Sequence, residues 1–331
     1  MDDKPFNLSR REMGKLRRGT ALAILALAPV LTFAYPTKPI TLVIPFNAGS
    51  APDTTYRILA AEAEKELGQK FVVHNRPGAG GTIGVKSVAQ AAPDGYTIGM
   101  AAVAILLLQP LVIDATNPGP DDVMPLVQSN EAPVALAVNA GSPWRTMNDL
   151  LAEARKRPGE VSVGIGGGPH NILHVQVALL EKSAGVRFNA IPYGAGQQFP
   201  ALLGGVIDFA SAQTALINQH VKAGKLRALA QVAPERVKGL EDVPTLKELG
   251  HNVTQNAYEF LFAPKGIPPA ALERLAGAFR KAVESDTFRD YGNRTGLIIL
   301  YLGPKELAER LRADSKTYRQ VVDEFGWAKK K

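Results

Sequence analysis

The sequence predicts an α/β protein with two lobes, each built on a mostly parallel sheet. Its 331 residues are enough for about two domains. Short apolar runs alternate with segments of helical periodicity, which is the pattern of parallel strands joined by helices. This alternation restarts after the turn-forming stretch Asn-Pro-Gly-Pro at 117–120, so a second lobe follows the first.

The first lobe begins with a buried strand at 40–45, an uninterrupted apolar run. A turn then leads into a helix, for which we expect Asp53 as N-cap and Gly68 as the closing residue. The elements expected next are a strand at 71–74, a glycine-rich loop at 75–81, a helix at 82–91, a turn at 93–95 and a strand at 96–101.

The second lobe repeats the same alternation. Its expected strands are 134–138, 161–165, 188–191, 206–210 and 226–232, and its expected helices are 148–157, 171–184, 198–204 and 214–223. The chain from Pro268 onward is mainly helical, and its last helix buries a stripe made of Leu307, Leu311, Tyr318, Val321 and Phe325. We therefore expect one lobe from 35–133 with 255–331 and the other from 134–254, with chain crossings near 131–134 and 251–257.

Composition and charge exclude several classes of protein. The chain has no Cys, so disulfides, thiolate nucleophiles and Cys-ligated metal sites are excluded. The formal net charge is +7 and falls to +4 without the first 34 residues, which hold six basic and three acidic side chains. Such a diffuse surplus does not indicate a nucleic-acid partner.

Residues 1–34 have the pattern of an export signal peptide. A polar, basic stretch precedes the apolar run 20–33, which is shorter than the roughly 20 residues of a spanning helix. Small side chains at Thr32 and Ala34 predict cleavage after Ala34. Arg10 and Arg11 resemble a twin-arginine signal, and a general secretory signal is the alternative. Either route leads to the periplasm.

Three glycine-rich turns, at 47–53, 164–170 and 193–198, follow predicted strands and precede predicted helices. Open α/β sheets bind ligands where parallel strands end. Glycine lets backbone N–H groups approach a ligand, and helix N-termini carry partial positive charge. Oriented dipoles of this kind can hold a carboxylate without Lys or Arg. One such turn is explained as a tight connection, but three in the same topological place favour a binding site.

Other motifs do not support a cofactor or an enzyme. The segment 78–84 lacks the G-x-G-x-x-G spacing and does not follow the first strand, so it is not typical of nicotinamide binding. His170 and His174 have the i, i+4 spacing of zinc ligands, but no Glu is interposed and no third ligand stands out. Asp53 is explained by its place at a helix start. We expect neither a metal nor a cofactor.

A set of segments, met in order along the chain, resembles one family. They are YPTKPI at 35–40, VIPF at 43–46, GQ at 68–69, VVHNRPGAGGTIG at 72–84, APDGYT at 92–97, PY at 192–193, LLGGVID at 202–208, AGKLRALA at 223–230, VPT at 243–245 and AP at 263–264. This order resembles the Bug/TctC substrate-binding proteins, the periplasmic receptors of tripartite tricarboxylate transporters. The most specific segment is 72–84.

The resemblance implies a two-lobed periplasmic-binding-protein, or Venus-flytrap, architecture that closes around a small organic acid. It implies a monomeric periplasmic receptor without catalytic activity, which delivers its ligand to the large and small membrane subunits of a transporter. Carried over to this sequence, the ligand-binding residues are Phe46, Asn47, Ala48, Gly49, Ser50, Asp53, Ala101, Ala102, Ile165, Gly166, Gly167, Gly168, His170, Tyr193, Gly196, Gln197, Asp208, Gln213 and Thr214. Asp208 is equally well explained as a structural residue.

The sequence also departs from the family pattern. Its first loop is less glycine-rich than usual, and Asn47 and Ser50 add hydrogen-bonding side chains. Its second loop lacks the Gly-Ser-x-x-His register, so either His170 or His174 takes the family position. We favour His170, because a ring at a helix N-terminus can face the cleft. Dicarboxylates, tricarboxylates, aromatic acids and amino acids all fit such a site.

Two alternatives to a transport receptor remain open at this stage. One is a secreted α/β enzyme acting on a small organic acid, with Asp53 or His170 as acid–base. The other is a sensory receptor for a two-component system, which shares the fold but not the transport partner.

The variants Asn47→Ala and Ser50→Ala are expected to weaken ligand binding more than they lower stability, because both residues lie on a loop aimed at the cleft. Titration calorimetry checks the affinity, and thermal unfolding checks the stability. Unchanged affinity in both variants contradicts the assignment of this loop.

Overall fold

The computed structural model describes Met1 and residues 35–328, apart from 168, 169 and 195. The expected export signal therefore lies outside the described residues, except for Met1. No helix in the described part of the chain combines the length and the apolar composition needed to span a bilayer.

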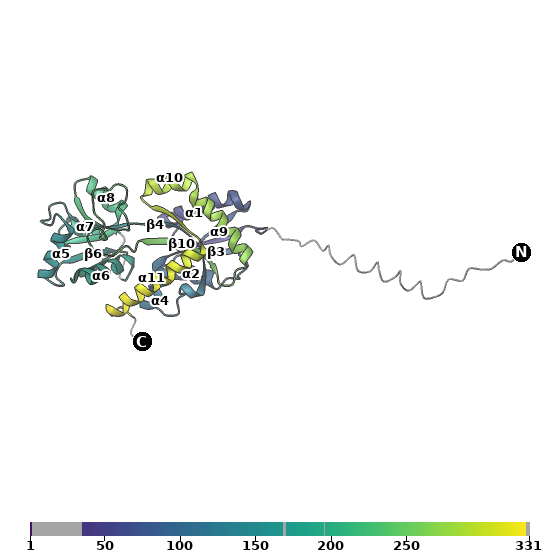
Figure 1. The fold of residues 1–331 in the computed structure, drawn as a ribbon, viewed down its shortest axis with the longest axis horizontal. Coiled ribbons are helices and arrows are strands. Elements are labelled where there is room, and N and C mark those ends of the chain that lie inside the picture. Colours follow the sequence, from purple (N-terminus) through teal and green to yellow (C-terminus); the bar gives the residue numbers. More distant parts are fainter. Residues whose placement is uncertain (2–34, 168–169, 195, 329–331) are drawn as a thin grey trace.

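The two sheets lie side by side, with β10 and β3 in one and β6 in the other (Figure 1). The first sheet has six strands in the order β11-β4-β10-β3-β1-β2. α1, α9 and α10 cover one face, and α2, α3, α4 and α11 cover the other. The strands are β1 (Ile40–Ile44), β2 (Phe71–Asn75), β3 (Thr97–Ala102), β4 (Val123–Ala132), β10 (Ala257–Pro264) and β11 (Ile298–Leu302). The helices are α1 (Ala51–Leu67), α2 (Thr82–Ala89), α3 (Val103–Leu107), α4 (Gln109–Val112), α9 (Pro269–Glu284), α10 (Asp286–Thr295) and α11 (Pro304–Glu324), with 3₁₀ turns at Ala79–Gly81 and Pro120–Asp122.

The second sheet has five strands in the order β7-β6-β8-β5-β9. α5 and α6 pack on one face, and α7 and α8 pack on the other. The strands are β5 (Val134–Asn139), β6 (Ser162–Gly166), β7 (Asn189–Tyr193), β8 (Phe209–Gln213) and β9 (Leu226–Val232). The helices are α5 (Met147–Lys156), α6 (Ile172–Ala184), α7 (Gln198–Leu203) and α8 (Thr214–Lys222). The α/β class predicted from the sequence is confirmed.

The pairing of the strands shows which ends of the two sheets face each other. β10 is antiparallel to both β3 and β4, so β3 and β4 run in the same direction. β4 leads through the single residue Pro133 into β5, which is antiparallel to β8. β8 in turn is parallel to β6. The carboxyl ends of β1 and β3 therefore point toward the second sheet, and those of β6 and β8 point back toward the first.

Three strands and one strand boundary differ from the expectation. β4, β10 and β11 were not predicted, although the chain crossings were expected near the ends of β4 and β10. The strand expected at 206–210 begins at Phe209, because Gly204 and Gly205 form a turn that leaves Val206 71% exposed. In the last helix the predicted stripe is buried as far as Val321, whereas Phe325 ends the helix and is only partly buried.

A buried polar network ties α11 to both strands that cross between the sheets. Arg310 on α11 forms an ion pair with Glu131 at the end of β4. The amide of Asn256, next to β10, donates to the other Glu131 oxygen at 2.7 Å. The Tyr258 hydroxyl on β10 donates to Asp314 on α11 at 2.7 Å, and the Arg310 guanidinium lies 4.0 Å from the centre of the Tyr258 ring. The network fixes α11 across the crossing point.

Arg310→Met is expected to lower the free energy of unfolding by about 3 kcal/mol, because it leaves the Glu131 carboxylate buried without its partner. Urea unfolding measures the change. Arg312→Met, at an exposed position on the same helix, is the matched control and should change stability little. Equal stability of both variants contradicts the role of the network.

Candidate functional site

The first predicted loop is held by a helix cap and a buried carboxylate. Ser50, and not Asp53 as expected, is the N-cap of α1, and its Oγ accepts from the Asp53 N–H. The expectation was wrong because Pro52 fits the first turn of a helix, so the helix starts two residues before Asp53. The backbone segment 47–49 is exposed, and its backbone dipoles are accessible to a ligand.

Asp53 has a structural role in holding this loop. It is 2% exposed, and its carboxylate accepts hydrogen bonds from Gly49 N at 2.9 Å, Asn75 Nδ2 at 2.8 Å and Arg57 Nε at 2.9 Å. Burial alone raises the pKa of Asp53, but the hydrogen bonds from Arg57, Asn75 and Gly49 outweigh it and hold the pKa below its ordinary value. Asp53 is therefore ionised and occupied by protein partners, and not available as an acid–base.

The end of β3 lies beside the first loop of the first sheet. Ala101 is buried, while Ala102 is partly exposed and caps the short helix α3. Phe46 is also partly buried and packs against the cores on both faces of this sheet. Of the two alanines at the end of β3, only Ala102 is therefore in part accessible.

The carboxylate of Glu259, beside the end of β3, was not predicted as a site residue from the sequence. Glu259 on β10 pairs directly with Ala102 and is partly exposed between the buried side chains Tyr258 and Phe260. No strand is predicted from the sequence at 257–264, so no pattern singles out Glu259. Only the register of β10 against β3 shows that it lies among the predicted loops.

The β6–α6 loop comes from the second sheet. α6 runs from Ile172 to Ala184 with Asn171 as N-cap, which agrees with the helix expected at 171–184. The Asn171 amide donates to Gly166 O at 2.7 Å, which closes the loop back onto the strand. Gly167 has a φ of 87°, which favours glycine. The predicted Gly168 lies outside the described residues, and the Ile165 side chain is buried in the core of this sheet.

His170 and His174 lie one above the other and belong to an aromatic cluster. Their rings are stacked with centroids 5.6 Å apart, and the Trp327 ring lies 4.2 Å from His174 and 5.0 Å from His170. Burial, together with the charge of His170, lowers the pKa of His174 to about 4, and burial lowers that of His170. Both rings are neutral at pH 7. Within the described residues no group of three metal-ligating side chains exists.

Two further predicted loops follow β7 and β8. Tyr193 is partly buried, Gly196 has a φ of 80°, and Gln197 is exposed just before α7. Gln213 is exposed at the end of β8, and the Thr214 N–H donates to Pro133 O between the two sheets at 2.9 Å. The adjacent Gln198, which was not a predicted ligand residue, is 2% exposed, and its Oε1 has no hydrogen-bond partner.

Asp208 lies away from these loops. It precedes the first residue of β8, whereas Gln213 is the last. Its carboxylate accepts from the N–H and the hydroxyl of Ser162, both at 2.7 Å, at the start of the neighbouring strand β6. The geometry gives Asp208 the structural role of joining two strand starts, at the end of the sheet opposite to Gly166 and Gln213.

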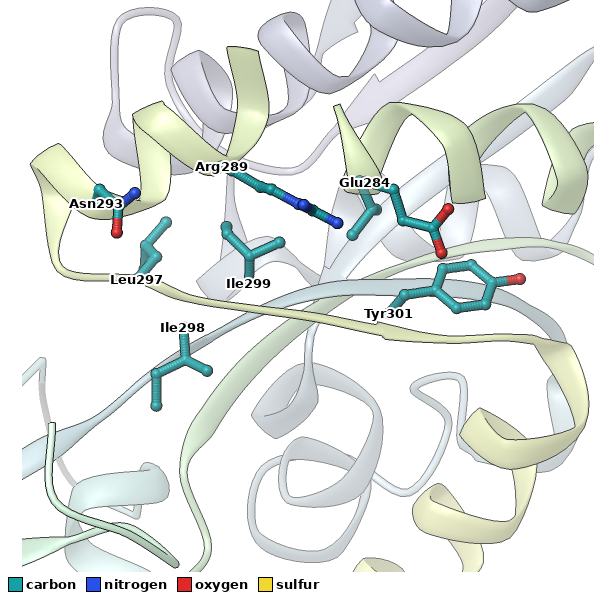
Figure 2. Close-up of a pocket in the computed structure, with 8 residues that line it drawn as sticks. Glu284, Arg289, Asn293, Leu297, Ile298, Ile299 and Tyr301 are labelled. Carbon is teal, nitrogen blue, oxygen red and sulfur yellow. The ribbon is translucent and has the colours of Figure 1, made fainter. Parts of the chain in front are cut away.

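Two depressions lie on the surface near these elements. One, of about 640 Å³, lies between α8 and the turn from α10 to β11, and Gln213, Thr214, Lys222, Lys238 and Arg294 line it. The other, of about 520 Å³, lies between α9, α10 and β11, and Glu284, Arg289, Ile299 and Tyr301 are among the residues that line it (Figure 2). The second depression shares no lining residue with the predicted loops.

The profile of the receptor family of tripartite tricarboxylate transporters, TctC, matches residues 55–327. The chain belongs to the TctC family. It is 33% identical over 313 residues to a UPF0065 protein in the gbd 5′ region of Cupriavidus necator, covering 94% of this chain and 95% of the relative. A TctC solute-binding protein from Polaromonas has a similar structure, with a TM-score of 0.79, 33% identity and coverage of 88% and 99% of the two chains.

Two solved TctC-like structures carry a ligand. MatC from Rhodopseudomonas palustris, with bound malate, is 26% identical with a TM-score of 0.69, over 87% of this chain and 100% of MatC. Another R. palustris protein, with adipate, is 26% identical with a TM-score of 0.71, over 89% and 99% of the chains.

Family membership confirms the expected two-lobed periplasmic-binding-protein architecture. TctC proteins are periplasmic solute-binding receptors, so this chain is a solute-binding receptor and not an enzyme. The alternative of a secreted enzyme is set aside.

Asp53→Asn is expected to lower the free energy of unfolding by about 2 kcal/mol at pH 7, because the buried charge-assisted hydrogen bonds are lost. Since the pKa of Asp53 is lowered on folding, its contribution is present above its unfolded pKa and is lost as the pH falls through the folded value. The difference from wild type should therefore shrink in acid.

Urea unfolding at neutral and at acidic pH tests this, with the exposed Asp242→Asn as the charge control. A pH-independent difference contradicts the assignment. Ser50→Ala also removes a helix cap and should lower stability by about 1 kcal/mol, so Asn47→Ala is the cleaner probe of ligand binding at this loop.

Proposed function

We propose that this receptor binds a small organic carboxylate between its two sheets and delivers it to the large and small membrane subunits of a tripartite transporter. One observation carries the proposal: the glycine-containing loop at the carboxyl end of β1, beside the end of β3, faces the glycine-containing loop at the carboxyl end of β6, beside the end of β8. Strand ends of this kind are where α/β sheets bind ligands.

The chemistry of these loops favours an anion held by oriented dipoles. The exposed segment 47–49 precedes the N-terminus of α1, and the segment 166–171 precedes that of α6. Helix N-termini carry partial positive charge and present unpaired N–H groups. The malate and adipate bound to two similar receptors are both carboxylates. The proposed ligand-binding residues are therefore those predicted from the sequence, without Asp208 and without Asp53 and Ile165, whose side chains are held inside the protein.

The proposal includes the working cycle of the receptor. The lobes 35–133 with 255–331 and 134–254 close on the ligand by bending where β4 continues into β5 and where the chain returns to β10. α11 spans this hinge, because Lys182 on α6 pairs with Glu324 at 2.6 Å and the Arg187 guanidinium lies over the Phe325 ring at 4.6 Å. The receptor is exported by residues 1–34 to the periplasm and acts there as a monomer.

A thermal-shift screen of the protein from Tyr35 onward, against mono-, di- and tricarboxylates, aromatic acids and amino acids, tests this function. A ligand at about a hundred times its Kd should add roughly 2.7 kcal/mol and raise Tm by a few degrees. The methyl esters of the same acids are the matched control, since they lack the charge that the loops recognise. No shift with any acid, or equal shifts with the esters, contradicts the proposal.

A further inference from the structure

Glu259 is a charged side chain at the very edge of the proposed site. Its Cα pairs with Ala102 on one side and with Asn130 on the other, near the end of the first sheet that faces the second. Tyr258 and Phe260 belong to the core beneath α11, while Leu261 belongs to the core beneath α1. Since side chains alternate along a strand, Glu259 lies on the face covered by α1.

The side chains around Glu259 are neutral. Tyr56 on α1 is buried, and its hydroxyl is 3.1 Å from Ser129 Oγ. The Asn130 amide donates to the same Ser129 oxygen at 2.9 Å. Among the described residues no Lys, Arg or His lies within ion-pair distance of Glu259. Arg57, the nearby cation on α1, is paired with Asp53.

The surroundings of Glu259 raise the pKa of its carboxyl group. Burial raises the pKa of Glu259 to about 7, and the Asn130 side chain offsets this only in part. Burial, and then the charge of Glu259, raise the pKa of Tyr56. Glu259 is nonetheless partly exposed as a residue, at the end of the first sheet that faces the second. An ionisable group without a cationic partner is costly to keep beside an anion, unless the ligand brings a partner for it.

We propose that the ligand is an amino carboxylate, whose carboxylate binds to the loops and whose ammonium group binds to Glu259. This inference rests on the proposed function and narrows its substrate class. A plain dicarboxylate would bring a second negative charge toward Glu259, whereas an ammonium group donates up to three hydrogen bonds to it. Glu259 then selects amino-bearing acids over acids of the same length without an amino group.

Calorimetric titration with matched probes tests the selection. The pairs are succinate and aspartate, glutarate and glutamate, and adipate and 2-aminoadipate, with 6-aminohexanoate added to place the amine at the far end. The wild-type protein should bind the best amino acid at least tenfold more tightly than its plain partner. In Glu259→Gln this preference should disappear or reverse, because the amide keeps the shape and a hydrogen bond but loses the charge. Glu273→Gln, an exposed position on α9, is the matched control and should keep the wild-type preference.

The outcomes separate failure of this inference from failure of the proposed carboxylate-binding function. If the plain acids bind at least as tightly as their amino partners to wild type, or if Glu259→Gln leaves the preference unchanged, the inference is wrong and the carboxylate receptor stands. If no member of any pair binds but another acid of the thermal-shift panel does, the inference is wrong and the carboxylate receptor stands; if no acid of that panel binds, the proposed function fails as well. Should Glu259→Gln not fold, the wild-type comparison and the variant Glu259→Asp, which keeps the charge and should keep the preference, decide the question.

Discussion

The antiparallel pairing of β4 with β10 is the constraint on which the rest of the molecule depends. Both strands belong to the first sheet, and each is connected to the second, β4 through Pro133 alone. This double crossing turns the carboxyl ends of the strands in the two sheets toward each other. The loops that can hold a ligand meet only for this reason. The Arg310–Glu131 ion pair also stabilises this arrangement, because it belongs to a network through which α11 contacts both β4 and β10.

Few charged side chains are available to a ligand at the predicted loops themselves. Asp53 is fully occupied by Arg57, Asn75 and Gly49, so its charge shapes the first loop and does not face a ligand. His170 and His174 are kept neutral by burial. What remains for recognition is backbone dipoles for an anionic group and one carboxylate, Glu259, for a cationic group. In the proposed complex, the backbone dipoles bind the carboxylate of an amino acid and Glu259 binds its ammonium group.

Much of the fold could be predicted from the sequence, because apolar strands followed by glycine-rich turns are local signals. The loops after β1, β6 and β7 are of this kind. β4 could not be predicted, since Gln128, Ser129, Asn130 and Glu131 interrupt its apolar pattern and are buried only through long-range partners. Asp208 was placed among ligand residues because a segment match does not show at which end of a strand a residue lies. Glu259 was missed because its neighbour Ala102 is distant in the sequence, and only the pairing of β10 with β3 brings the two together.

The crystal structure of this receptor with the tightest-binding acid tests the account most directly. We predict that the carboxylate contacts the backbone N–H groups of Asn47 and Ala48 and of the β6–α6 loop, with an ammonium group within hydrogen-bond distance of Glu259. A carboxylate held instead by Lys222, Lys238 and Arg294, in the depression between α8 and the α10–β11 turn, would contradict it.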